Sequence, residues 1–413
     1  MLKLEPWRKN LYAIAFSQFV ALGAANLIFP FMPFYVEDLG VTGSSAVALW
    51  SGLLGTATGV TLFIFSPIWG SLADRFGRKP MLLRAYLGAT VTMTLQGFVQ
   101  NVWQLAALRA LQGAFSGTIP AATALVAAGA PRDRVAFALG VVQMALFSSQ
   151  FVGPLVGGVL ATSIGFRPTF VAVGFFFFVS FLLILFIVEE HFEPPAAEER
   201  TGFIDNLREV LARRPLVILI GVVFFLNAGP AFVRPIIPLV VQSFDSATSA
   251  ETLSGFVFAA LALTSAVAAL TSSRVSGRLG YRNALALTTV CAGAAYLPVA
   301  VANNLPSFLL LMAVVGLFSG AMIPLVNALI AAWAPPGREA SVFGLSGSSL
   351  ALAFAVAPLS GGAVASAAGV NASFLVIGGI MLAVGVAVLA LVREPEQARE
   401  ASEPGEAASE AGE

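Results

Sequence analysis

A short segment of mixed charge and glycine, residues 70–80, carries the clearest chemical signal of the sequence. Its candidate functional residues are Gly70, Asp74, Arg75, Gly77, Arg78 and Lys79. We expect Gly70 to allow two helices to approach closely and Gly77 to permit a tight turn. A loop on the inner side of a membrane would account for the basic residues alone. It would not account for Asp74 or the glycines, so the segment indicates a charged contact at the edge of a membrane.

Two arginines interrupt long apolar stretches. Arg109, followed by Gln112 and Gly113, lies six residues beyond Trp103, which is roughly 9 Å at 1.5 Å per residue. An arginine at this depth costs a few kcal/mol unless it is paired or reaches the surface. Arg234 lies about 19 residues, roughly 29 Å, along another such stretch, so both side chains can share one level. Surface-reaching side chains explain each arginine singly, and a shared polar site is the alternative hypothesis.

A third stretch carries a regular series of small residues and one proline. The series consists of Gly140, Gly153, Pro154, Gly157 and Gly158. Glycines at these spacings let two helix backbones touch, and the proline bends the helix at the contact.

Carboxylates are confined to the ends of the apolar stretches. Glu37, Asp38 and Glu251 are predicted at outer ends, while Asp133 and Glu339 are predicted on the inner side. Taken singly, each of these carboxylates is explained as a solvated charge in a loop. Together with the two arginines, the outer acids are candidate coupling or substrate charges.

Enzymatic chemistry has little support in the sequence. The single His191 lies in an acidic stretch with no second His or Cys near it, and the single Cys291 lies in an apolar run, so we expect no metal, no cofactor and no disulfide within the chain. The sequence contains neither a nucleophile–base motif nor the glycine-rich nucleotide loop of ATP-driven pumps. We therefore predict that the protein is not an enzyme.

The composition requires a lipid environment. Of 413 residues 58% are hydrophobic and 11% are charged, against about 25% charged in soluble proteins. The mean hydropathy is +0.88, and the zero net charge gives no reason to expect a nucleic-acid partner. Twelve segments have the roughly 20 apolar residues that span a bilayer. They are residues 11–36, 47–72, 81–99, 103–130, 136–164, 168–188, 215–241, 251–272, 283–301, 306–334, 340–368 and 371–392.

The distribution of basic residues predicts the orientation. If the N-terminus lies inside, 19 of the 22 basic residues lie on the cytoplasmic side and only Arg167 lies on the outer side. This bias predicts that both termini are cytoplasmic in an inner-type cell membrane. The first apolar stretch, Leu11–Val36, is too long for a signal peptide and reads as the first span.

The two halves of the chain repeat each other at an offset of 203–205 residues. The matching segments are 30–33 with 235–238, 113–117 with 316–320, 130–134 with 334–338, and 152–158 with 356–362. The copy of the charged segment keeps Gly280 but has Gly277 in place of the acid. Parallel six-helix repeats predict two pseudo-symmetric bundles with a substrate site between them.

This duplication divides the chain into four predicted parts. They are a six-helix bundle over 1–188, a charged linker over 189–214, a second bundle over 215–392 and a tail over 393–413. The linker has apolar residues at helical spacing between 203 and 211, which predicts an amphipathic helix on the cytoplasmic interface. The composition of the tail predicts disorder.

These motifs resemble those of the major facilitator superfamily, and most closely its twelve-span drug:H⁺ antiporters. The charged segment is similar to the family signature between helices 2 and 3. The resemblance implies that Asp74 faces the start of helix 11, that Asp133 pairs with the basic residues, and that these contacts close the cytoplasmic side. It also implies that Arg109 takes part in proton coupling and that the helix 5 glycines mark an antiporter. Ser149 stands where a further glycine is expected, and no predicted span interior carries the acid common in these antiporters.

The sequence therefore predicts an all-α membrane protein of major facilitator fold, acting as a monomeric secondary transporter in the lipid bilayer. The first hypothesis for its function is proton-coupled antiport that exports lipophilic drugs or other amphipathic molecules, giving multidrug and antibiotic resistance. A glycolipid or lysolipid flippase of the same fold is the alternative. In that case Arg109 and Arg234 would contact the anionic headgroup of the lipid.

Overall fold

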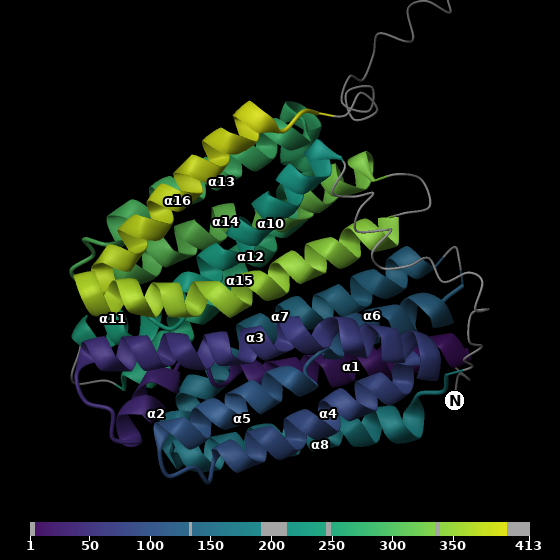
Figure 1. Cartoon of the computed structure of the whole chain (residues 1–413), viewed down its shortest axis with the longest axis horizontal. Helices are drawn as coiled ribbons and strands as arrows, with labels where there is room; N and C mark the ends of the chain where they lie inside the picture. The colour runs from purple at the N-terminus through teal and green to yellow at the C-terminus, as the bar shows by residue number, and fades with distance from the viewer. Residues whose placement is uncertain (1–4, 132–133, 191–212, 245–248, 335–338, 395–413) are drawn as a thin grey trace, which may run out of the picture. The chain divides into compact units, whose positions relative to one another are not determined.

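The computed structural model describes residues 5–131, 134–190, 213–244, 249–334 and 339–394, and all regular structure among them is helical (Figure 1). The first eight helices are α1 (Pro6–Asn26), α2 (Met32–Asp38), α3 (Ser44–Phe76), α4 (Arg78–Gln96), α5 (Val102–Phe115), α6 (Thr118–Gly129), α7 (Val135–Ile164) and α8 (Phe166–Ile187). The others are α10 (Arg214–Val233), α11 (Ile237–Phe244), α12 (Ala250–Leu279), α13 (Tyr281–Val299), α14 (Leu305–Trp333), α15 (Glu339–Ala368) and α16 (Val370–Leu391). The predicted linker helix at 203–211 and residues 395–413 of the predicted tail lie outside the described residues.

The chain forms two compact units that do not follow the sequence order. The first unit combines residues 1–200 with 231–262 and 354–373. The second combines residues 201–230, 263–353 and 374–413. The division of the sequence into bundles over 1–188 and 215–392 stays a prediction.

Nine helical stretches of the described residues are long and apolar enough to cross a membrane. They include most of the spans predicted from the sequence. Three predicted spans, 11–36, 81–99 and 283–301, fall outside this set, and the first of them is divided between α1 and α2. The count of twelve spans therefore stays a prediction.

The repeated proline pairs interrupt helices at matching places. Pro30 lies in the turn between α1 and α2, and Pro33 lies in the first turn of α2. In the second half, Pro235 lies between α10 and α11, and Pro238 lies in the first turn of α11. Proline has no N–H to donate inside a helix and is well tolerated in a first turn, which explains both interruptions.

The predicted span 103–130 is also interrupted, which the sequence repeat did not indicate. It is divided into α5 and α6 by Ser116, which is extended, and Gly117, which has φ of +125°. Only glycine adopts such a φ without strain. The matching stretch around Ser319 and Gly320 stays helical within α14.

Glycine lets helices pack backbone to backbone in both units. In the first unit α4 packs against α8, α3 against α5, and α1 against α7 and α8. In the second unit Gly293 of α13 faces α16, where a Cβ added at Gly378 would lie 3.0 Å from the carbonyl oxygen of Gly293. Its neighbour Gly379 has no described heavy atom within 4 Å of such a Cβ. Small residues at contacts are the usual means of helix association in lipid.

This difference gives a stability prediction with a control on the same helix. Gly378→Ala should destabilise the protein by about 1–3 kcal/mol, because the new methyl group also lies 2.8 Å from Leu297. Gly379→Ala should leave stability unchanged or raise it, since alanine favours helix. The measurement is thermal unfolding in detergent, followed by labelling of the single thiol, Cys291 of α13. Equal melting temperatures for the two variants would contradict the packing described here.

Candidate functional site

The charged segment joins two helices through one residue. α3 runs to Phe76 and α4 begins at Arg78, so Gly77 ends one helix and starts the next with φ of +97°. A Cβ added at Gly70 would meet no heavy atom of the described residues within 4 Å, so the expected close approach stays a prediction. The prediction that Gly77 makes a tight turn agrees with its conformation.

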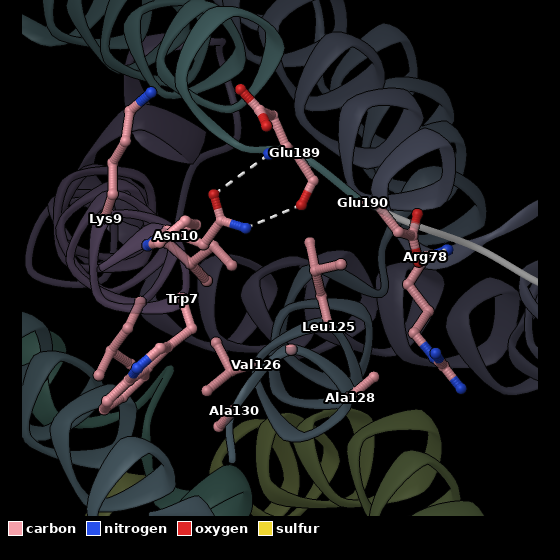
Figure 2. A pocket seen from close by; sticks show the side chains of 14 residues that line it. Trp7, Lys9, Asn10, Arg78, Leu125, Val126, Ala128, Ala130, Glu189 and Glu190 are labelled. Atoms are coloured by element: carbon pink, nitrogen blue, oxygen red, sulfur yellow. Dashed lines mark hydrogen bonds between the residues drawn. The ribbon is translucent and has the colours of Figure 1, made fainter. Parts of the chain in front are cut away.

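The basic residues of this segment differ in their surroundings. Arg75 is exposed, and its guanidinium carbon lies 5.4 Å from the ring centroid of Phe76. Arg78 is half-buried and lines a cavity of about 570 Å³ with Trp7, Lys9 and Glu190 among its other lining residues (Figure 2). The side chain of Asp74 and all of Asp133 lie outside the described residues, so their expected contacts stay predictions.

The segment is fastened to the end of α8. The backbone N–H groups of Arg78 and Lys79 donate to the two carboxylate oxygens of Glu190, at 2.9 and 2.8 Å. The ammonium group of Lys79 donates to the carbonyl of Val188 at 2.6 Å. One residue earlier, Asn10 of α1 exchanges two hydrogen bonds with the backbone of Glu189, at 2.7 and 3.1 Å (Figure 2).

Arg109 lies in a polar cluster without a carboxylate. Its Nη1 donates weakly to Gln112 Oε1 at 3.4 Å, and its Nη2 lies 3.6 Å from the sulfur of Met32. Gln112 Oε1 also accepts from the side chain of Gln96 at 3.1 Å, and the Tyr35 hydroxyl donates to the Gln96 carbonyl at 2.7 Å. The Nε of Arg109 is buried and has no hydrogen-bond partner among the described residues. No described carboxylate forms an ion pair with this arginine.

Arg234 approaches the same turn as Arg109. It lies between α10 and α11, with its guanidinium carbon 4.3 Å from the ring centroid of Phe29. Phe29 and Met32 both belong to the stretch where α1 gives way to α2. The structure thus brings the two arginines predicted to share one level to residues 29–32.

The outer acids predicted beside these arginines have other neighbours. Glu37 accepts a hydrogen bond from Gln242 at 3.4 Å. Burial raises the pKa of Glu37 above its ordinary value, the Gln242 bond lowers it by less, and the charge of Glu251 raises it. Neither Glu37 nor Asp38 forms an ion pair with Arg109 or Arg234 within the described part of the chain.

The predicted series of glycines and one proline lies in α7, and its glycines contact two different helices. A Cβ added at Gly153 would lie 2.6 Å from the Gly23 carbonyl of α1, and one at Gly157 would overlap the Leu27 carbonyl just beyond α1. A Cβ at Gly158 would overlap the Glu251 carbonyl of α12. Gly140, on the same helix, has open space around it. The predicted backbone contact therefore exists for three of the four glycines.

The repeat of this series makes the same pair of contacts. Gly361 and Gly362 of α15 stand 204 positions after Gly157 and Gly158. Added Cβ atoms there would overlap the carbonyl of Phe232 in α10 and the carbonyl of Ala48 in α3. All these residues belong to the first unit.

These contacts form two lines of close helix approach, which we name the glycine seam. Between α7 and α12 it includes Gly158, Gly255 and a hydroxyl pair, Thr162 with Thr252, at 3.1 Å. Between α3 and α15 it includes Gly52, Gly55, Gly59 and Gly362. Thr56 of α3 also accepts from the backbone N–H of Leu359 at 3.2 Å.

Arg84, which contacts the end of α5 rather than the seam, was missed by the sequence analysis, which treated it only as a cytoplasmic basic residue. It lies within α4, and its Nη2 donates to the carbonyls of Phe115 and Ser116 at 3.3 and 3.1 Å. Its guanidinium carbon lies 3.6 Å from the ring centroid of Trp69, whose indole N–H donates to the Ala114 carbonyl at 2.6 Å. These two side chains thus satisfy the carbonyls where α5 ends. The sequence signal was an arginine five residues past the other charges.

Comparison with known proteins agrees with this architecture. The sequence model of the family described as "Major Facilitator Superfamily" matches residues 14–250 and 231–411. The multidrug resistance protein MdtG of Salmonella arizonae is 34% identical over 384 residues, covering 91% of this chain and 93% of that protein. The multi-drug resistance efflux pump PmrA of Streptococcus pneumoniae is 33% identical over 368 residues, covering 89% and 92%.

A solved structure shows the same fold. The human organic anion transporter MFSD10 superposes with a TM-score of 0.71 at 21% identity, over 93% of this chain and all of that one. With the helical architecture and the two relatives, these findings identify a membrane-embedded transporter rather than an enzyme. The chain belongs to the Major Facilitator Superfamily.

Proposed function

We propose that this transporter is a monomeric, proton-coupled antiporter that exports lipophilic or amphipathic small molecules by alternating access. It would lie in the inner cell membrane with both termini in the cytoplasm. The similarity to two multidrug efflux proteins over about nine-tenths of the chain supports the substrate class. The same similarity does not favour the flippase hypothesis.

The observation that carries the transport mechanism is the repeated glycine seam. Under the predicted orientation, the residues of the seam lie in the outer halves of their helices. The seam joins α7 to α12 and α3 to α15 by backbone contacts and a few neutral hydrogen bonds. Among the described residues these contacts include no ion pair, so separating the helices breaks none. The seam would open for release to the outside.

Proton coupling is proposed at the outer end of the first span. Glu37 lies just beyond the predicted span 11–36, and burial raises its pKa. A carboxyl with a raised pKa keeps its proton to a higher pH than an ordinary glutamate, and it can therefore exchange protons nearer to neutrality. Arg109 and Arg234 would act as permanent charges near the route, because an arginine does not titrate in this range.

Gradient dependence is the first test. Purified protein in liposomes should move a lipophilic dye against its gradient when a pH difference is imposed, because the sequence has no ATP-binding loop. A protonophore should abolish this movement, and empty liposomes are the control. Transport that needs ATP and ignores the protonophore would refute the antiporter.

Opening of the seam is tested with two glycines of α7. Gly158→Ala should weaken the closed seam by about 1–3 kcal/mol, since the methyl group would overlap Glu251 and approach Cα of Thr252. Labelling of Thr162→Cys by an impermeant thiol reagent, in a Cys291→Ser background, should then become roughly fivefold faster or more. Gly140→Ala is the matched control and should leave the rate unchanged. The same rate in both variants would show that the seam does not govern outer access.

The role of Glu37 predicts a change in the pH profile. Exchange by the unmodified protein should rise as the external pH falls toward the raised pKa of Glu37, because the protonated form then becomes populated. Glu37→Gln is permanently neutral and should lose this acidic limb, while Asp38→Asn should retain it. Dye exchange measured across external pH checks this. An unchanged profile in Glu37→Gln would exclude Glu37 as the proton acceptor.

A further inference from the structure

A glutamate follows the last helix of each sequence half and caps another helix of that half. Glu190 follows α8, and Glu394 follows α16, 204 positions later and within the repeat offset of 203–205. Each of them lies in the same unit as the helix it caps.

Glu190 caps the start of α4 with both oxygens. Its Oε1 accepts from Arg78 N at 2.9 Å and its Oε2 from Lys79 N at 2.8 Å. The first N–H groups of a helix have no partner within the helix, and the helix dipole favours a negative charge at this end. A carboxylate from a distant part of the chain thus takes the place that a local side chain usually fills. No local side chain caps this helix, because its N-cap residue is Gly77.

Glu394 does the same for α13. The backbone N–H of Tyr281 donates to its Oε1 at 2.6 Å. The N-cap residue is again a glycine with positive φ, Gly280 at +76°. A Cβ there would lie 2.5 Å from the Glu394 carboxylate, so the glycine leaves room for the cap.

A basic side chain completes each arrangement in the opposite direction. The ammonium group of Lys79 donates to the Leu185 and Val188 carbonyls at the end of α8, at 3.2 and 2.6 Å. Arg282 donates to the Leu389 carbonyl near the end of α16. A cation is favoured at a helix C-terminus as an anion is at an N-terminus. The loop before α4 is therefore held to the end of α8, and the loop before α13 to the end of α16. In each pair one acid of the helix end binds the loop, and one basic side chain after the loop binds the helix end.

The cap binds the backbone of Arg78 and not its side chain. Glu190 binds the backbone N–H of Arg78, and the described residues show no hydrogen bond to its guanidinium. The acid therefore fixes the backbone of the charged segment and does not occupy the guanidinium of Arg78. The contacts of this segment that the family resemblance implies for closing the cytoplasmic side are named here the cytoplasmic gate.

We propose that Glu190 and Glu394 are positioning residues of the cytoplasmic gate. Each makes the loop before α4 or α13 move together with the end of α8 or α16. Glu190 belongs to the start of the predicted linker 189–214, so this cap binds the first described residues of the linker to the charged segment. The inference rests on the proposed transport function for its effect on flux, but the coupling itself is a property of the two helix ends.

The test compares two adjacent glutamates. Glu190→Gln keeps the size of the side chain but cannot accept from two N–H groups with both of its terminal atoms. Glu189→Gln is the matched control, because Glu189 makes its described contacts through its backbone. Hydrogen exchange of the peptide covering residues 78–82 should become about fivefold faster in Glu190→Gln and stay unchanged in Glu189→Gln. Glu190→Asp, which keeps the charge, should lie between the two.

The second half provides an independent arm. Glu394→Gln should speed exchange over residues 281–285 and leave residues 78–82 unchanged. Gradient-driven dye flux should fall about fivefold in Glu190→Gln, with the same amount of folded protein, and should be retained in Glu189→Gln.

The outcomes separate this inference from the proposed function. Equal exchange in Glu190→Gln and Glu189→Gln overturns the cap, whatever the flux. Faster exchange with normal flux shows a cap without a role in the gate and overturns the positioning role. If the unmodified protein moves no dye under a pH gradient, the proposed function fails, and exchange alone decides whether the loop is fastened.

Discussion

A backbone N–H or C=O that lacks a partner costs several kcal/mol in hydrocarbon, and this penalty bears on each place where a helix ends inside a span. At several helix ends of the described residues, a side chain supplies the partner. Asn101 and Asn304 cap α5 and α14 by accepting from Gln104 N and Ser307 N, at 3.0 and 2.9 Å. Where α5 stops inside its span, side chains from α3 and α4 take up the free carbonyls. The charged segment before α4 and the break after α5 are two such places, and in each a side chain distant in sequence is the partner.

The same requirement explains why the charged segment is more than a loop. Its glycine lets α3 end and α4 begin with a single residue between them, which leaves the first N–H groups of α4 without local partners. A carboxylate from beyond α8 supplies them. Charge on the segment thus has two separate uses. The backbone is held by one acid, and Lys79 binds the carbonyls at the end of α8, while Arg75 is exposed and Arg78 lies beside the cavity.

Much of the architecture could be predicted from the sequence, because the prolines and glycines that form the recognisable pattern also cause the helix breaks and contacts. The two repeated proline pairs each stand at a helix break, and glycines spaced as Gly153, Gly157 and Gly158 bring backbones together. The internal repeat also predicts contacts. Gly361 and Gly362 contact α10 and α3, which correspond in the repeat to α1 and α12, and Gly157 and Gly158 contact the end of α1 and α12. Family membership was predicted from these motifs, and the comparisons confirmed it.

Other features depended on distant partners that no local pattern reveals. Arg84 reads as one more basic residue near a loop until the carbonyls at the end of α5 are placed beside it. Glu190 reads as part of a charged linker. The break at Gly117 was hidden by the repeat, because the equivalent stretch in α14 continues as helix.

The glycine seam has a consequence for how this protein can change over generations. The helices approach closely in the seam because glycine has no side chain. Any substitution at Gly52, Gly158 or Gly362 therefore adds atoms at a position next to a backbone carbonyl of the facing helix. Mutation at these positions can push the helices apart but cannot draw them closer. Adjustment of the contact is left to the residues facing the glycines, and the seam therefore drifts in only one direction unless selection keeps restoring it.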